Sequence, residues 1–140
     1  MNIEFKLSLN GVTPSKAHDT DAGFDLYSVA TYRIMSGEMA TVSTGVFVNI
    51  PEGYVGLLFS RSGMGKAGLR LSNCVGVIDA GYQGEIGVMV YNDSQHYQQI
   101  PMGGKIAQLV ILPLPQVTLK YVHEFSAETA RGEKGFGSSG

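Results

Sequence analysis

Residues 73–85 read Asn-Cys-Val-Gly-Val-Ile-Asp-Ala-Gly-Tyr-Gln-Gly-Glu, and the other segments of the chain can be arranged around this stretch. The apolar run from Cys74 to Ile78 contains β-branched residues and predicts a short strand buried on both faces. Asp79-Ala80-Gly81 then supplies turn chemistry, and a second strand is predicted from Ile86 to Tyr91. An aspartate in the turn of this hairpin, with Tyr82 three residues later, predicts a small pocket lined by a carboxylate and an aromatic ring. An ordinary turn aspartate beside a half-buried tyrosine is the alternative interpretation.

The composition indicates a single globular domain. The 140-residue chain is 44% hydrophobic and only 16% charged, and at this length folding buries roughly two thirds of the unfolded surface. A formal net charge of −2 excludes a broadly basic surface and argues against nucleic-acid binding. The single cysteine, Cys74, cannot form an intrachain disulfide, and we expect its thiol to be a small buried hydrophobe. Because neither a leader-like segment nor an apolar run of membrane-spanning length is present, we expect a cytoplasmic protein with no membrane partner.

Short strands separated by Gly- and Pro-containing turns dominate the sequence. Ile3 to Leu9 alternates apolar and polar residues, which predicts a half-buried strand. Ser62 to Gly68 is small and Gly-rich and could hold at most one helical turn, and no window longer than about ten residues has a helical period. The pattern predicts an all-β barrel or sandwich. Further strands are predicted at 24–30, 31–35, 41–50, 54–59, 69–78, 85–92, 96–100, 105–112 and 117–125.

The sequence changes character after residue 125, so we predict a β-barrel domain over 1–125 and a Gly-rich C-terminal arm over 126–140. The arm contains Phe136 as its only large apolar residue, a composition that cannot build a strand with a buried face. A disordered tail is one interpretation. The other is a flexible arm that orders on a ligand, because Phe136 offers a ring for stacking and Arg131 offers a charge for phosphate.

Five Gly-flanked polar clusters lie between the predicted strands, at 22–26, 61–63, 73–84, 104–108 and 131–140. In this order and at these separations they resemble the five motifs of the trimeric dUTPase family, the dUTP diphosphatases. The most specific stretches are Gly-Val-Ile-Asp-Ala-Gly-Tyr-Gln-Gly and the final Arg-Gly-Glu-Lys-Gly-Phe-Gly-Ser-Ser-Gly. The resemblance implies a distorted jelly-roll β-barrel that hydrolyses dUTP to dUMP and pyrophosphate. It also implies a homotrimer with shared active sites, each assembled from phosphate residues of one chain, the Asp79 hairpin of a second and the arm of a third.

The predicted phosphate site combines positive charge with backbone N–H groups. Arg61-Ser62-Gly63 opens a small-residue turn and supplies both. Gln108 is polar within an apolar strand; it is either a satisfied core glutamine or, as the resemblance implies, a second phosphate contact. A carboxylate near a triphosphate suggests Mg²⁺, and we expect Asp25 to bind metal-coordinated water while the substrate phosphates hold the metal. Direct ligation by Asp25, or a plain turn acid, are the alternatives.

Asp79 is the predicted catalytic residue. Hydrolysis of a phosphoanhydride needs an oriented water and an acceptor for its proton, and the resemblance implies that Asp79 directs water at the α-phosphorus. It further implies that Tyr82 lies against C2′ of the sugar and leaves no room for a 2′-hydroxyl. Phe136 would stack on the base and Arg131 would clamp the terminal phosphates as the arm closes. The other implied substrate contacts are Asn73, Gly76, Val77 and Ile78, which read the uracil edge, and Gly137 and Ser138 in the arm.

Several positions depart from the family pattern. Ser60 stands where Pro is usual, and Gly81 and Gly104 stand where acids are common. The acid missing at Gly104 typically supports the phosphate-site arginine, so this support is in doubt. The departures leave room for a nucleotide-binding or interaction module without turnover. A dCTP deaminase is disfavoured because Met89 stands where that relative of the same fold has its catalytic Glu.

Overall fold

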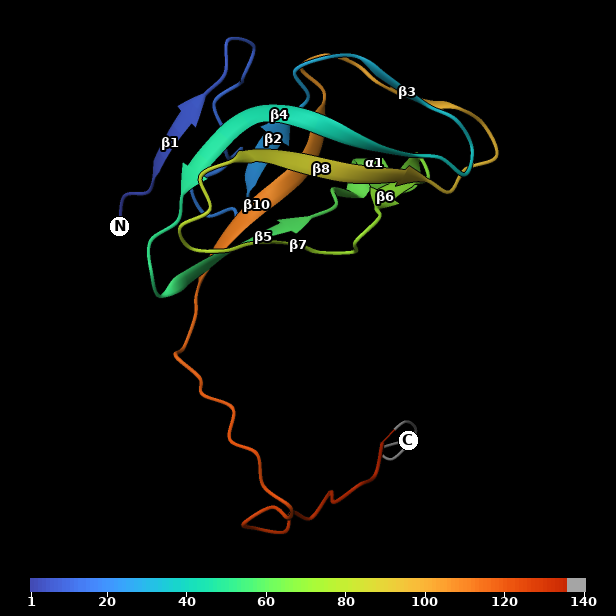
Figure 1. The fold of residues 1–140 in the computed structure, drawn as a ribbon. Coiled ribbons are helices and arrows are strands. Elements are labelled where there is room, and N and C mark those ends of the chain that lie inside the picture. Colours follow the sequence, from blue (N-terminus) through green and yellow to red (C-terminus); the bar gives the residue numbers. More distant parts are fainter. Residues whose placement is uncertain (136–140) are drawn as a thin grey trace.

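The structure is a computed structural model that describes residues 1–135, and antiparallel strands make up nearly all of its regular secondary structure (Figure 1). One four-stranded sheet has the order β1-β4-β8-β6, formed by Glu4–Leu7, Met39–Asn49, Glu85–Asn92 and Leu69–Leu71. The second has the order β2-β10-β5-β7, formed by Phe24–Tyr27, Lys105–Pro113, Tyr54–Phe59 and Gly76–Ile78. A small third sheet pairs β3 (Tyr32–Ile34) with β9 (Gln98–Ile100), and α1 (Ser62–Lys66) is a single short helix.

Buried apolar side chains from both four-stranded sheets form one core. Along β4 and β8 many buried residues alternate with more exposed ones, because successive side chains of a strand point to opposite faces. Complete burial of one such side chain stabilises the fold by about 1.5–3 kcal/mol. The first sheet contributes Val42, Val46, Ile86, Val88 and Val90 to this core, and the second contributes Leu26, Leu58, Ile106 and Leu109.

The predicted all-β fold is confirmed, and so is the restriction of helix to one turn within 62–68. The predicted strands at 41–50, 54–59, 85–92 and 105–112 correspond to β4, β5, β8 and β10, while β2, β3 and β9 are shorter than predicted. Within residues 1–135, no helix combines the length and the apolar character needed to cross a membrane.

The prediction of a doubly buried strand from Cys74 to Ile78 was wrong. The chain must pass here from β6 in one sheet to β7 in the other, and it turns at Cys74, whose φ is +62°. Cys74 is exposed rather than buried. Among residues 1–135, β7 is an edge strand that pairs only with β5. Val77 points to the face opposite that of its buried neighbour Gly76, and it is exposed.

The strand predicted at 117–125 was also wrong. β10 ends at Pro113, and from there to residue 135 the described chain contains no strand and runs away from the barrel (Figure 1). Pro113 and Pro115 cannot donate ladder hydrogen bonds, and a strand is stable only when its backbone groups find partners. The apolar residues that produced the strand pattern are exposed instead; they include Val117, Leu119, Tyr121 and Phe125.

β1 forms as a strand but is not half-buried as predicted. It lies at the edge of its sheet, pairs only with β4, and leaves Phe5 and Leu7 exposed. Beside it an apolar hollow of about 270 Å³ is lined by residues that include Ile3, Phe5 and Phe24. The described part of this chain places no other segment over these side chains, so their apolar surface faces solvent.

The side chain of Asn92 is fully buried and is predicted to be essential for stability. Its amide nitrogen donates to the carbonyl oxygens of Ile34 at 2.9 Å and His96 at 2.8 Å, and its oxygen accepts from Ser94. Asn92→Ala leaves these buried groups without partners and should lower the free energy of unfolding by about 1–3 kcal/mol or more. Denaturant unfolding at fixed protein concentration measures the loss. Asn10→Ala, at an exposed turn position, is the matched control, and an equal effect of the two changes would contradict this role.

Candidate active site

Two strands and two loops meet in a polar hollow of about 280 Å³ beside the start of α1. β10 lies between β2 and β5, so its Gln108 is opposite Asp25 on one side and Phe59 on the other. Because Arg61 follows β5 by two residues, this register brings Asp25, Arg61 and Gln108 to one place. Ser62, the first residue of α1, also lines the hollow. Four of the side chains that the sequence predicted for phosphate and metal binding are therefore brought together, and Arg131 is not among them.

Asp25 is the centre of an ionic cluster in this hollow. Asp25 is only 8% exposed; its Oδ1 forms an ion pair with Arg61 Nε at 2.7 Å, and its Oδ2 forms one with Lys105 Nζ at 2.8 Å. Partly buried ion pairs are screened by salt much less than exposed ones. An arginine has five N–H donors, so the contact through Nε leaves others for phosphate oxygens. Asp25 thus supports Arg61, the role that the absence of an acid at Gly104 had put in doubt.

Lys105 is a site residue that sequence reasoning did not identify. A bulge between Lys105 and Ala107 shifts the pairing of β10 with β2, so Ile106 and Ala107 are both buried. The register shift places Lys105 opposite Tyr27, from where its ammonium reaches Asp25. Its signal in the sequence is weak, a basic residue directly after a Pro- and Gly-containing turn.

Gln108 and Ser60 hold the loop that carries Arg61. The Gln108 amide nitrogen donates to the Ser60 carbonyl oxygen at 3.4 Å, while the Ser60 hydroxyl accepts from the Leu71 N–H at 3.1 Å. Ser60 therefore ties the end of β5 to β6 through a bond that a proline side chain could not make. Gly23 approaches Gln108 so closely that a Cβ there would lie 2.9 Å from its amide oxygen. Gly63 follows Ser62 in α1 and is open to solvent.

Acidic groups in the hollow decide how a metal ion could be held. The His18 N–H donates to the Asp21 carboxylate at 3.0 Å, and this bond lowers the pKa of Asp21 below its ordinary value. Residues 1–135 contain no group of three or more His, Cys, Asp or Glu side chains that could hold a metal by themselves. Both oxygens of Asp25 already form ion pairs with cations, but a carboxylate has further lone pairs. The donor set fits an ion that is held by substrate phosphates and reaches Asp25 through water.

Asp79 and Tyr82 lie together on one turn but do not line this hollow. Asp79 follows β7 directly and is exposed, and its carbonyl oxygen accepts from the Tyr82 N–H at 3.2 Å. The Gly81 N–H donates to the Ile50 carbonyl oxygen at 3.2 Å, which ties the turn to the end of β4. Gly81 has a φ of +81°, a conformation for which glycine is well suited. Asn73, Gly76, Val77 and Ile78 lie on or just before β7, next to Asp79.

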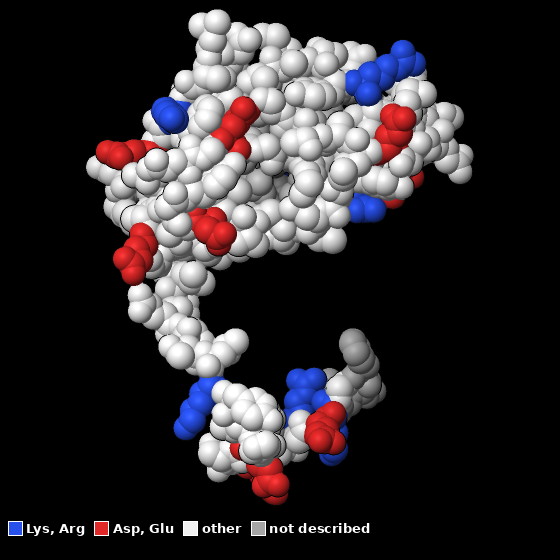
Figure 2. All heavy atoms as spheres, viewed as in Figure 1, with Lys and Arg blue, Asp and Glu red and all other residues white. Residues whose placement is uncertain are grey.

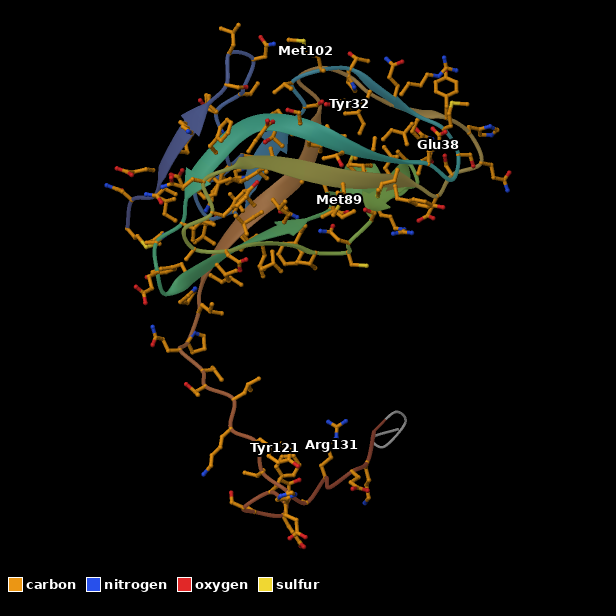
Figure 3. The ribbon with its side chains drawn as sticks, viewed as in Figure 1. Tyr32, Glu38, Met89, Met102, Tyr121 and Arg131 are labelled. Carbon is orange, nitrogen blue, oxygen red and sulfur yellow. The ribbon has the colours of Figure 1, made fainter. Side chains whose placement is uncertain are left out.

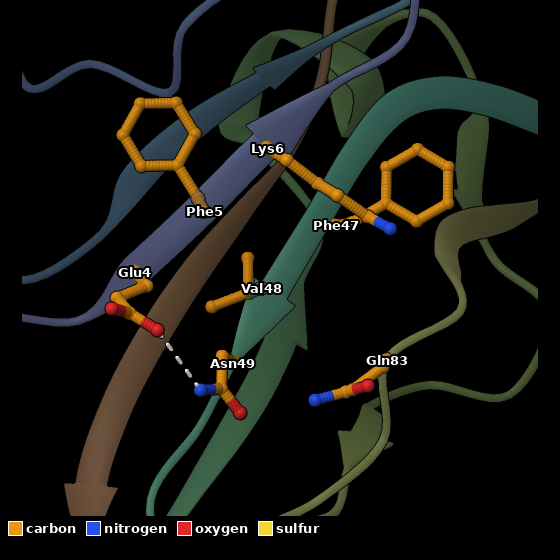
Figure 4. Close-up of a pocket in the computed structure, with 7 residues that line it drawn as sticks. All are labelled: Glu4, Phe5, Lys6, Phe47, Val48, Asn49 and Gln83. Atoms are coloured by element: carbon orange, nitrogen blue, oxygen red, sulfur yellow. Dashed lines mark hydrogen bonds between the residues drawn. The ribbon is translucent and has the colours of Figure 1, made fainter.

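A larger hollow lies on the other side of the turn. It has a volume of about 310 Å³, and Figure 4 shows its wall formed by β1 and β4, with Gln83 facing them. The Asn49 amide donates to Glu4 across its floor at 3.2 Å. This hollow contains none of the predicted site residues, so we do not assign it to the reaction.

The described part of the arm, residues 126–135, lies away from both of these regions on its own chain. Figure 3 shows Tyr121 and Arg131 at the end of an extended segment far from the barrel, and Arg131 Nε donates to the Lys134 carbonyl oxygen at 3.0 Å. Phe136, Gly137 and Ser138, which the sequence also predicted for the site, lie outside the described residues. On the face shown in Figure 2 acidic and basic side chains are interspersed, and the arm carries charges of both signs.

Comparisons with known proteins show which family the chain belongs to. The dUTPase family model matches residues 10–140. A deoxyuridine 5′-triphosphate nucleotidohydrolase of Mycobacterium leprae is 46% identical over 133 residues, which cover 91% of this chain and 86% of that protein. The corresponding protein of Tropheryma whipplei is 44% identical over 142 residues, covering 100% of this chain and 96% of its own.

Solved structures give the same result. Staphylococcus bacteriophage 80alpha dUTPase with dUPNHPP has a TM-score of 0.93 and 39% identity, covering 99% of this chain and 98% of that one. The dUTPase of phage phi11 of S. aureus, studied for its coordination of a structural Mg(II) ion, has a TM-score of 0.84 and 35% identity, covering 91% and 100%. The chain belongs to the dUTPase family.

Proposed function

We propose that this chain carries out the reaction of its family, the hydrolysis of dUTP to dUMP and pyrophosphate, with Asp79 as the general base. The observation that carries the proposal is the convergence of Arg61, Ser62 and Gln108 in one polar hollow, with Arg61 oriented by Asp25. Such a cluster provides the directed positive charge that phosphoryl chemistry requires.

In the proposed reaction a water oxygen attacks the α-phosphorus, and Asp79 accepts its proton. The bond from the α-phosphorus to the oxygen bridging to the β-phosphorus breaks, and pyrophosphate leaves. Arg61 and Lys105 stabilise the negative charge that develops on the phosphate oxygens. The exposed place of Asp79 on the turn allows its carboxylate to approach a substrate that is bound from outside.

Recognition of the nucleoside is assigned to β7 and the turn that follows it. β7 pairs only with β5, so its other edge presents unpaired backbone groups that can read the uracil edge as a neighbouring strand would. A site whose donors and acceptors match uracil leaves buried groups unpaired with cytosine. Tyr82 would lie against C2′ of the sugar, where its half-exposed ring leaves no room for a 2′-hydroxyl.

Mg²⁺ is the proposed cofactor, held by the substrate phosphates and by Asp25 through water. When bound, it neutralises part of the triphosphate charge. The charges of the cluster support a requirement for a metal ion, because the carboxylates of Asp21 and Asp25 offset the positive charges of Arg61 and Lys105. Additional positive charge must therefore come with the nucleotide or from another chain, and Arg131 of the arm could provide it.

We propose a homotrimer in which each active site uses phosphate residues of one chain, the Asp79–Tyr82 turn of a second and the arm of a third. Two observations support sharing: the turn does not line the phosphate hollow, and the described part of the arm, residues 126–135, lies away from its own barrel. The exposed apolar residues of β1 and of 117–125 also form surface that an isolated chain would rarely keep. In this assembly residues 1–125 form the domain, which includes the extended segment after β10, and residues 126–140 act as the closing arm.

A binding module without turnover is the second candidate, and it was suggested by the departures at Ser60 and Gly104. The hydroxyl of Ser60 accepts a hydrogen bond from Leu71, and Asp25 pairs with Arg61 in place of the acid that is missing at Gly104. These contacts favour an enzyme with turnover over a module that only binds the nucleotide.

Asp79→Asn keeps the shape of the side chain but removes the base. We expect kcat for dUTP to fall about 10²–10⁴-fold with little change in KM, because a general base acts in the transition state. Pyrophosphate release with Mg²⁺ measures this. Asp93→Asn, which alters an exposed ion pair with Arg70, is the control and should retain activity. Turnover of the Asp79→Asn enzyme at the wild-type rate would exclude Asp79 as the base.

Asp25→Asn separates support of Arg61 from binding of metal-coordinated water. The change removes the ion pair that orients Arg61, so kcat/KM for dUTP should fall about 10–100-fold even at saturating Mg²⁺. Lys105→Met preserves the bond to Arg61 and should have the smaller effect. Steady-state kinetics across a Mg²⁺ titration provide the test. If high Mg²⁺ restored full activity to Asp25→Asn, support of Arg61 would not be part of its role.

Mixing two inactive variants tests the shared sites. One carries Asp79→Ala, and the other is truncated after Phe125. In a three-fold arrangement every mixed trimer has one complete site, so subunit exchange at equal amounts should restore about one quarter of wild-type activity. Mass measurement of differently tagged chains verifies the exchange. Mixed trimers without activity would refute the sharing of sites.

A further inference from the structure

The ring of Tyr82 rests directly on the backbone of Gly84. A Cβ placed at Gly84 would lie 2.4 Å from the Tyr82 Oη, 2.5 Å from Cζ and 2.9 Å from Cε2. Gly84 is not among the glycines with positive φ, so its backbone conformation is open to other residues. What excludes a side chain at this position is the space occupied by the ring.

The same end of the ring also forms a hydrogen bond. The Tyr82 hydroxyl donates to the Glu85 carbonyl oxygen at 3.0 Å, while Tyr82 remains 46% exposed. One part of the ring is thus held against its own chain, and the rest is open to a ligand. Contact with Gly84 and a bond at the hydroxyl together determine the plane of the ring.

Glu85 connects this arrangement to the barrel. Its carboxylate accepts from the Gly45 N–H at 2.8 Å and from the Ser43 hydroxyl. Both donors lie on β4, where the pairing with β8 shifts register between Ser43 and Phe47. Gly45 is buried at this bulge with a φ of +65°. The plane of the Tyr82 ring is therefore set relative to a rigid strand.

We infer that Gly84 and Glu85 are positioning residues that set the plane of the Tyr82 ring and so determine how strictly the enzyme excludes ribonucleotides. The inference rests on the proposed contact between Tyr82 and C2′ of the sugar. Exclusion of a 2′-hydroxyl by contact requires that the ring cannot move away. The absence of a side chain at Gly84 lets the ring lie against the backbone, and the hydrogen bond to Glu85 holds the ring there. Displacements of about 1 Å can change rates by two orders of magnitude in enzymes.

The experiment compares kcat/KM for dUTP and UTP in four enzymes: the wild type, Gly84→Ala, Tyr82→Ala and the double variant. Gly84→Ala should lower the dUTP/UTP ratio about tenfold or more, because the methyl group moves the ring. In the Tyr82→Ala background the same change should have no further effect on the ratio, since the ring it acts on is gone. Gly65→Ala is the control, because a Cβ at Gly65 meets nothing within 4 Å.

Glu85→Gln provides a second route if Gly84→Ala does not fold. It keeps the shape of the side chain, removes its charge, and should lower the ratio in the same direction. Thermal unfolding of every variant separates misfolding from changed selectivity.

The outcomes separate this inference from the proposed function. If Tyr82→Ala left the ratio unchanged, the sugar contact itself would fail and the inference with it. If Tyr82→Ala lowered the ratio while Gly84→Ala and Glu85→Gln did not, the positioning role alone would be overturned. An effect of Gly84→Ala that persisted in full without Tyr82 would also overturn it.

Discussion

The hydrogen-bond register of β10 determines where the phosphate-binding side chains meet. This strand lies between β2 and β5, so Gln108 is opposite residues of both, and Asp25 and the loop after β5 arrive at the same hollow. A shift of one residue would turn every side chain of β10 to the other face of the sheet. The core side chains Ile106, Ala107 and Leu109 oppose such a shift, since it would expose them. Burial of apolar surface in this way holds polar groups in position.

Asp25 shows how burial and charge act together in this site. A buried carboxylate is costly unless it is paired, and here two cations, one from the loop after β5 and one from the start of β10, pair with it. The same ion pairs restrict Arg61 and Lys105, so part of the entropy of ordering these long side chains is lost on folding and not on binding. A preformed geometry for phosphate is thereby available before the nucleotide arrives. The Tyr82 ring is restrained in a comparable way, by contact with Gly84 and a bond to Glu85.

The errors of the sequence predictions have one physical origin. Apolar and polar residues alternate in 117–125 and in β1, which indicates apolar side chains that become buried in the functional protein. The alternation does not indicate whether the same chain or another chain buries them. Within the described residues both segments are exposed. The stretch around Cys74 failed for a related reason, because a short apolar run has the same composition whether it continues as one strand or crosses between sheets. The helical turn at α1 was predicted correctly, since its small residues permit little else.

Local patterns in the sequence determined the strand-rich fold, the limits of most central strands, and the identity of the residues that carry charge or a ring near Gly-rich turns. Those patterns depend on neighbours within a few positions, and a single sequence contains them. Only the tertiary structure decided that Asp25 binds both Arg61 and Lys105, that Ser60 bonds Leu71, and that the Tyr82 ring lies on Gly84. These contacts depend on strand register and on bulges in β4 and β10, which are set by the packing of the whole core.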